Sequence, residues 1–150
     1  MLTCLQRHFD KIQVLTINRN KIGFKGAIQI AQNFRYMKSL TTLDISHNEI
    51  GDLGICDVVT NLFNNNINLE EINLSGNFIC KNFNYFSKYS DKLVTYFTTS
   101  SRLHTIRLGY NNLRGSSNGH VDKLLQSFIE IGTIKTIDLQ NNLLGKTFGP

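Results

Sequence analysis

The chain has 150 residues and a formal net charge of +5, with 41% hydrophobic and 18% charged residues. These proportions fit one globular domain and exclude a disordered chain. The Lys and Arg residues are scattered without a dense run, which favours a solvated basic surface and leaves nucleic-acid binding as the minor alternative. The apolar runs are only a few residues long, so the sequence predicts no insertion into a membrane.

The cysteines indicate a reducing compartment. Cys4, Cys56 and Cys80 are odd in number, and no pair has the spacing of a zinc site. The first nine residues contain no apolar stretch of signal-peptide length. Free thiols without a signal peptide are typical of an intracellular, cytosolic protein, which is the localisation that we expect.

Residues 1–11 carry Leu2, Leu5 and Phe9 at helical spacing. From residue 12 onward, one pattern recurs five times, with repeats starting near residues 12, 40, 69, 103 and 134. Because the end of a stacked array exposes its core, residues 1–11 are expected to form a capping helix or the tail of a degenerate repeat.

Each repeat has the form apolar, two variable, apolar, one variable, apolar, two variable, Asn, one variable, apolar. The second apolar position recurs after 28, 29, 34 and 31 residues, a period that is typical of a solenoid. The recurrent Asn residues are Asn20, Asn48, Asn77, Asn111 and Asn142. Since an amide both donates and accepts, we expect these five to satisfy buried backbone groups where the chain leaves each strand.

The centre of each repeat alternates apolar and variable residues, as in Leu15-Thr16-Ile17, and therefore predicts a short strand. One such strand cannot bury its apolar side alone, so we expect five to stack in parallel around one core. Between the strands, residues 23–34, 54–62 and 121–128 carry apolar stripes at helical spacing and are predicted to be helices.

The third interval differs from the others. Residues 80–91 lack the Gly pair of the earlier intervals and are predicted to form a longer loop before a helical stripe at Leu93, Val94 and Phe97. Four aromatic residues fall within this loop, at positions 83, 85, 86 and 89. Two interpretations stay open. Either Phe83 and Phe86 fill the core, or Tyr85 or Tyr89 forms an exposed ridge that anchors a partner.

The repeat resembles the leucine-rich-repeat family over about residues 12–144, and its long period resembles the ribonuclease-inhibitor-like class. This resemblance implies an α/β fold, namely a right-handed solenoid that forms a segment of a horseshoe. Its five parallel strands would line the concave face and its helices the convex face. Residues 1–150 would then form a single domain.

No catalytic motif accompanies the repeats. The sequence contains no HExxH, P-loop or GxGxxG, and its four His residues fall at unrelated repeat positions. The Gly-rich segment 115–119 lacks the Lys of a phosphate-binding loop and is interpreted as a plain loop. We therefore expect no enzyme and no catalytic, metal, cofactor or small-molecule site.

The predicted concave face displays the variable positions within and just after each strand. Five strands at about 4.8 Å spacing would span roughly 20 Å and supply about 800 Å² to a partner. Mixed charges on this face favour a protein partner over nucleic acid or lipid. The candidate partner-binding residues are Arg19, Asp44, His47, Glu71, Asn73, Arg107, Tyr110 and Asp138.

The sequence thus predicts a module that binds one protein partner. Members of the ribonuclease-inhibitor-like class often block an enzyme, which suggests an inhibitor or regulator. The bias toward Asn, Ile, Lys and Phe resembles leucine-rich-repeat effectors of intracellular bacteria such as Legionella and suggests an effector or effector-regulator translocated into a host cell, although a protist origin explains it equally well. The alternative is a scaffolding fragment of a larger leucine-rich-repeat protein, since residues 143–150 follow the last strand without a covering helix.

Overall fold

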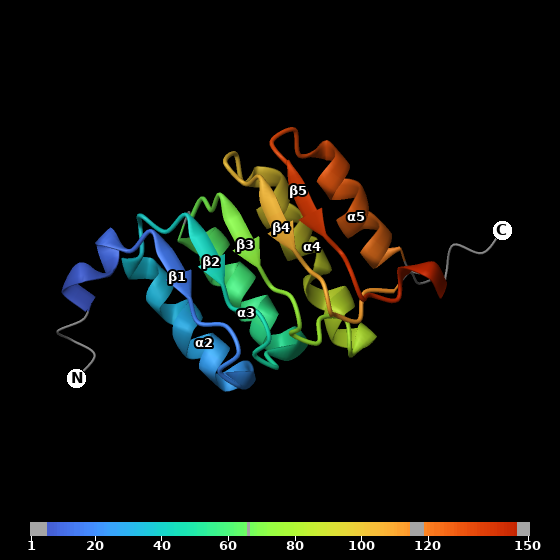
Figure 1. Cartoon of the computed structure of the whole chain (residues 1–150), viewed down its shortest axis with the longest axis horizontal. Coiled ribbons are helices and arrows are strands. Elements are labelled where there is room, and N and C mark those ends of the chain that lie inside the picture. Colours follow the sequence, from blue (N-terminus) through green and yellow to red (C-terminus); the bar gives the residue numbers. More distant parts are fainter. Residues whose placement is uncertain (1–5, 66, 115–118, 147–150) are drawn as a thin grey trace.

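The computed structural model describes residues 6–65, 67–114 and 119–146. Figure 1 shows two layers, with the strands side by side in one layer and the four α-helices together on one side of it. The strands are β1 (Val14–Thr16), β2 (Thr42–Asp44), β3 (Glu71–Asn73), β4 (Thr105–Arg107) and β5 (Thr136–Asp138). The helices are η1 (Gln6–Lys11), α2 (Gly23–Asn33), η2 (Phe34–Tyr36), α3 (Gly51–Asn64), α4 (Phe83–Thr99), α5 (His120–Glu130) and η3 (Leu144–Lys146).

The five strands form one parallel sheet in the order β1-β2-β3-β4-β5. Its register aligns the middle residue of every strand, so that Leu43, Ile72 and Ile106 are successive partners. These three side chains are fully buried under the helices, whereas Ile137 on the last strand is 38% exposed. The period-two alternation therefore predicted the five strands correctly, and in β2, β3 and β4 the predicted inward residue is buried.

The Asn column, defined as the five recurrent Asn residues, links one repeat to the next. Asn77 Oδ1 accepts a hydrogen bond from the backbone N–H of Asn48 at 3.0 Å, and Asn77 Nδ2 donates to the carbonyls of Ile45 at 3.0 Å and Leu74 at 3.2 Å. Asn111 repeats this pattern one repeat further on. Asn48 and Asn77 are fully buried. The predicted structural role of the column is confirmed.

The third interval corrects one prediction. Helix α4 begins at Phe83, so most of the predicted loop forms the first turns of a 17-residue helix. Asn82 caps this helix, since its side-chain oxygen accepts from the N–H of Asn84 at 3.2 Å. A helix is favoured here because Phe86, Tyr89 and Leu93 lie on one stripe, and all three are buried.

Asp52 in the first turn of α3 holds this early helix start in place. Its buried carboxylate accepts from the N–H of Cys80 at 2.7 Å, the N–H of Asn82 at 2.8 Å and the hydroxyl of Tyr89 at 2.8 Å. Tyr89 is therefore a core residue, and the interpretation of it as an exposed anchor is wrong. Phe86 fills the core as predicted, and Tyr85 is 42% exposed.

Three predictions concern residues outside the described ones. They are the helical spacing of Leu2 and Leu5, the Gly-rich loop from residue 115 to 118 and the core position of the Phe83 side chain. In the described part of residues 1–11, η1 is a short 3-10 helix that packs against η2. Phe9 of η1 packs partly buried against the core.

Candidate protein-binding surface

The side of the sheet opposite the helices presents one set of side chains, which we call the strand face. It consists of the outward residues of β1–β5 and of the exposed residues that follow each strand on the same side. The sheet register places Asp44, Asn73, Arg107 and Asp138 in one row across four strands. Glu71 lies in the neighbouring row, beside Thr42 and Thr105. Five of the eight predicted residues therefore lie close together on this face.

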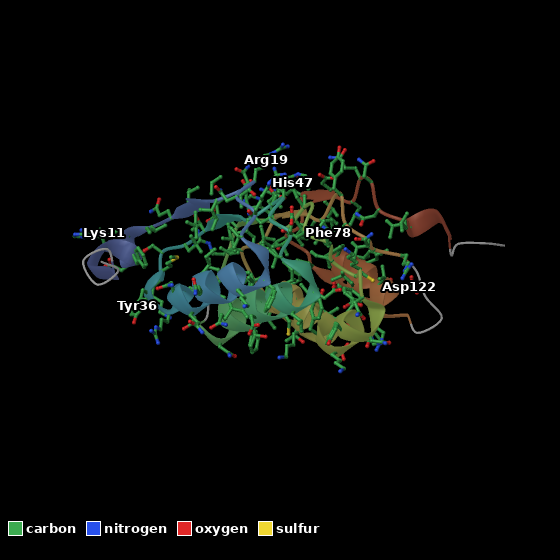
Figure 2. The ribbon with its side chains drawn as sticks, turned by 90° about the horizontal axis from the view of Figure 1, so that it is seen from below. Lys11, Arg19, Tyr36, His47, Phe78 and Asp122 are labelled. Carbon is green, nitrogen blue, oxygen red and sulfur yellow. The ribbon has the colours of Figure 1, made fainter. Side chains whose placement is uncertain are left out.

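The other three predicted residues follow the strands, in a column that shares one backbone conformation. The residue before each recurrent Asn has a positive φ, and we call this set the left-handed column. It comprises Arg19 (φ 57°), His47 (φ 54°), Gly76 (φ 65°), Tyr110 (φ 55°) and Asn141 (φ 53°). The N–H groups of the first four continue the ladder of the sheet, for example His47 N to Ser75 O at 2.7 Å. Figure 2 shows Arg19 and His47 on the sheet side of the molecule.

His47 and Tyr110 meet in the left-handed column although one repeat separates them. Their ring centroids are 5.8 Å apart, and Tyr110 is 49% exposed. Gly76 lies between them, and a Cβ at this position would come within 2.3 Å of His47 Nδ1. The absent side chain at Gly76 therefore makes room for the His47 ring, and together the two rings offer a rigid aromatic surface of the kind that often dominates protein contacts.

The polar residues of the strand face are partly occupied with one another. Arg107 pairs with Glu71 at 3.3 Å, and Asn73 Nδ2 donates to Asp44 Oδ2 at 3.2 Å. Asp44 also accepts from the N–H of Ser46 at 2.9 Å, and Asp138 accepts from the N–H two residues on in the same way. These two Asp residues thus shape the strand ends, a role that is separate from any contact with a partner.

Charge on this face is mixed. Within residues 6–65, 67–114 and 119–146, the ion pairs are Arg107 with Glu71 and Arg102 with Glu70. Arg19 is exposed and belongs to neither pair. The surface therefore offers an unpaired cation at one end and the carboxylate of Asp138 at the other, an arrangement that can select a partner by charge complementarity.

A second candidate surface was missed by the sequence analysis. Phe24, Leu53, Phe78 and Tyr85, which are between 41% and 48% exposed, all line one groove with a volume of about 530 Å³. We call it the edge groove, because it lies where the helices begin and the chain leaves the strands. Figure 2 views the molecule from this edge, and Phe78 lies nearer the middle of the view than Arg19 or His47.

One signal in the sequence could have pointed to the edge groove. The variable position after each recurrent Asn holds Lys21, Glu49, Phe78, Asn112 or Leu143. Phe78 is a large aromatic residue in a slot where the neighbouring repeats have charged or polar side chains. In the structure it has a positive φ of 60°, and its side chain is exposed. Phe24 and Leu53 give no comparable signal, because they lie at unrelated repeat positions.

The described residues bring together few groups that could take part in a chemical reaction. Ser90 Oγ lies 3.0 Å from His120 Nδ1, but Ser90 is buried and ties α4 to α5. Burial raises the pKa of the Cys80 thiol to about 11, which keeps it protonated and unreactive. Burial and the Asp52 carboxylate raise the pKa of Tyr89. The described part of the chain contains no group of three or more His, Cys, Asp or Glu residues that could hold a metal.

The comparisons with known proteins concern the repeat and the fold. A family model described as leucine-rich repeat matches residues 36–55, which include β2. The α/β fold with five parallel strands is also similar to solved structures of known proteins. The tropomodulin C-terminal domain of Caenorhabditis elegans matches with a TM-score of 0.68 and 10% identity, over 92% of this chain and 81% of that one.

A second solved structure, the actin-binding site 2 of leiomodin-1, matches with a TM-score of 0.65 and 13% identity. This match covers 92% of the chain and 76% of the leiomodin-1 structure. No significant match to the sequence was found among curated proteins. Among the described residues, no helix is long and apolar enough to span a membrane.

Proposed function

We propose that the chain is a protein-binding module that engages one protein partner through its strand face. The observation that carries this proposal is the juxtaposition of His47 and Tyr110 over Gly76, beside the Arg107–Glu71 pair. Aromatic residues and Arg in a preformed arrangement are the side chains that most often dominate protein interfaces. Because the ring contact and the ion pair already bring these side chains together before binding, less conformational entropy is lost when a partner docks.

The same proposal includes a shape for the binding face. In a right-handed solenoid with strands on the concave side, the strand face would curve around a convex partner. The eight residues Arg19, Asp44, His47, Glu71, Asn73, Arg107, Tyr110 and Asp138 would form its contact area. The short parallel strands and the helices on one side of the sheet support this shape.

The partner class is a finer part of the proposal. The sequence resemblance to ribonuclease-inhibitor-like proteins and to bacterial effectors favours an enzyme whose site the strand face would cover. Actin is the second candidate, and it is favoured by the structural likeness to the actin-binding site 2 of leiomodin-1. A co-sedimentation assay of the chain with actin filaments tests this candidate directly.

The central experiment captures partners from cell extract with the wild-type chain and with Arg107→Glu and Tyr110→Ala in parallel. We expect both variants to lose the main partner, because each removes a contact group from the strand face. Lys92→Glu, an exposed substitution on α4, is the matched control and should retain it. Activity of a captured enzyme, measured with and without the chain, tests regulation. If every captured protein binds both strand-face variants as well as wild type, the proposal is wrong.

A further inference from the structure

The edge groove gathers exposed apolar side chains from three repeats. Phe24 lies in the first turn of α2, Leu53 in the first turn of α3 and Tyr85 in the first turn of α4, and Phe78 precedes α4. Gly54 allows α3 to pack close to α2, since a Cβ at this position would lie 3.1 Å from Phe24 Cα. Scattered exposed apolar residues need no explanation, but four in one groove mark an interaction site.

Two ammonium groups lie over the aromatic rings of this groove. Lys81 Nζ is 4.8 Å from the centroid of the Phe78 ring, and Lys88 Nζ is 5.5 Å from that of Tyr85. Neither lysine takes part in the ion pairs of the described residues. The cations are therefore held at the apolar surface with their hydrogen-bonding capacity open toward an incoming anion.

Two carboxylates line the groove, and neither forms an ion pair with Lys81 or Lys88 among the described residues. Asp52 is buried, and its oxygens accept the three hydrogen bonds from Cys80, Asn82 and Tyr89. Glu49 is exposed and lines the same groove. The groove thus has an apolar floor, two lysines toward α4 and one exposed carboxylate, so it differs from a uniformly basic surface.

We propose that the edge groove binds a short acidic segment of a protein partner. An apolar side chain of that segment packs against Phe24, Leu53 and Phe78, and a neighbouring carboxylate pairs with Lys81. An anionic membrane fits less well, because lipid-binding patches cluster four or more basic residues, whereas here a carboxylate lies among two lysines. A second copy of the chain is disfavoured by its net charge of +5.

The site is independent of the strand face. Its residues lie in the loops and first helical turns, and none of them is among the eight residues proposed to contact a partner through the sheet. A strand-face substitution such as Arg107→Glu should leave binding in the groove unchanged. This separates the two proposals experimentally, since either can fail while the other holds.

The experiment selects phage-displayed random 12-residue peptides on the whole chain, immobilised through one terminus. We expect enrichment of peptides that combine Asp or Glu with Phe, Leu or Trp. The Kd of one enriched synthetic peptide, measured by fluorescence polarisation, should rise about tenfold or more in Leu53→Asp and in Lys81→Glu, which corresponds to about 1.4 kcal/mol each.

Matched controls test the same chemistry elsewhere. Phe63→Asp changes an equally exposed apolar residue at the other end of α3, and Lys123→Glu reverses an exposed charge on α5. Both should leave the Kd within about twofold of wild type. Far-UV circular dichroism checks the fold of each variant. If Leu53→Asp does not fold, Lys81→Glu and the amide chemical shifts around Phe78 carry the test.

Three outcomes overturn the proposal. The first is enrichment of peptides without acidic residues, or a peptide whose Kd is unchanged by Lys81→Glu. The second is binding to phosphatidylserine vesicles that Lys81→Glu abolishes without any acidic peptide being selected, which would assign the groove to a membrane. The third is a concentration-dependent dimer that Leu53→Asp dissociates, which would assign it to a second copy of the chain.

Discussion

The Asn column and the left-handed column are adjacent in every repeat, yet they make different demands on the side chain. The Asn column has one residue type in all five repeats, and its central members are buried with every amide group bonded to the neighbouring repeat. The left-handed column has one backbone conformation and five residue types, namely Arg, His, Gly, Tyr and Asn.

This difference follows from what each position must satisfy. In the Asn column, the fold requires a particular set of donors and acceptors, so only one side chain serves. In the left-handed column, the fold requires only a dihedral angle, which costs a non-Gly residue roughly 1–2 kcal/mol but leaves the side chain free. Variation is therefore concentrated where side chains reach solvent, and that is where a binding surface can evolve.

The largest effect is expected in the Asn column. Asn77→Ala removes the acceptor of the Asn48 N–H and the donor to Ile45 O and Leu74 O, all of which are buried. We expect the free energy of unfolding to fall by about 3 kcal/mol or more. Asn20→Ala, at the exposed edge, is the control and should cost about 1 kcal/mol. Urea denaturation measures both, and equal losses would contradict the ranking.

The next effect concerns Cys80, a left-handed residue (φ 65°) that points to the core, in the slot held by Gly23 and Gly51 in earlier repeats. Burial raises its pKa from 9.0 to about 11, so the folded chain holds a proton that the unfolded chain releases. Its contribution is complete below pH 9 and is lost as the pH rises toward 11, by roughly 2 kcal/mol. Cys80→Ala should make the unfolding free energy fall less steeply over this range.

A smaller effect is expected at Gly76, where the left-handed column needs both a dihedral angle and space. Gly76→Ala is strained at φ 65° and brings a methyl group against the His47 ring. We expect a loss of about 1–2 kcal/mol in thermal or urea unfolding. The double variant with His47→Ala should recover part of this loss. Simple additivity of the two substitutions would show that the ring contact is not the cause.

The smallest effect on stability is expected for Tyr110→Asn. Asn tolerates the left-handed conformation, and Tyr110 is half exposed, so the unfolding free energy should change by no more than about 0.5 kcal/mol. Binding of a strand-face partner should nevertheless be lost. This variant tests whether a side chain of the left-handed column can be changed with a loss of binding but not of stability. A large destabilisation would contradict the difference between the left-handed column and the Asn column.

The sequence predicted the regular part of this molecule. The alternation around Leu43 and Ile72 placed the strands, and the recurrent Asn predicted the bonds between repeats, because both depend on a rule that every repeat obeys. The same regularity predicted that Asp44, Asn73, Arg107 and Asp138 would be displayed on one face, and the sheet register places them in one row. Sequence reasoning failed at α4, where an aromatic-rich stretch suggested a loop, because the cap at Asn82 and the distant carboxylate of Asp52 decide the helix start.

By itself, the sequence determined the number of strands, their inward side and the position of the Asn column, since these follow from periodicity and from the need to satisfy buried backbone groups. Only the tertiary structure decided which irregular residues meet. His47 reaches Tyr110 because Gly76 leaves space between them, and Phe24, Leu53 and Phe78 form one groove although no repeat position relates them. Such contacts depend on stacking distance and side-chain direction, which a one-dimensional pattern does not contain.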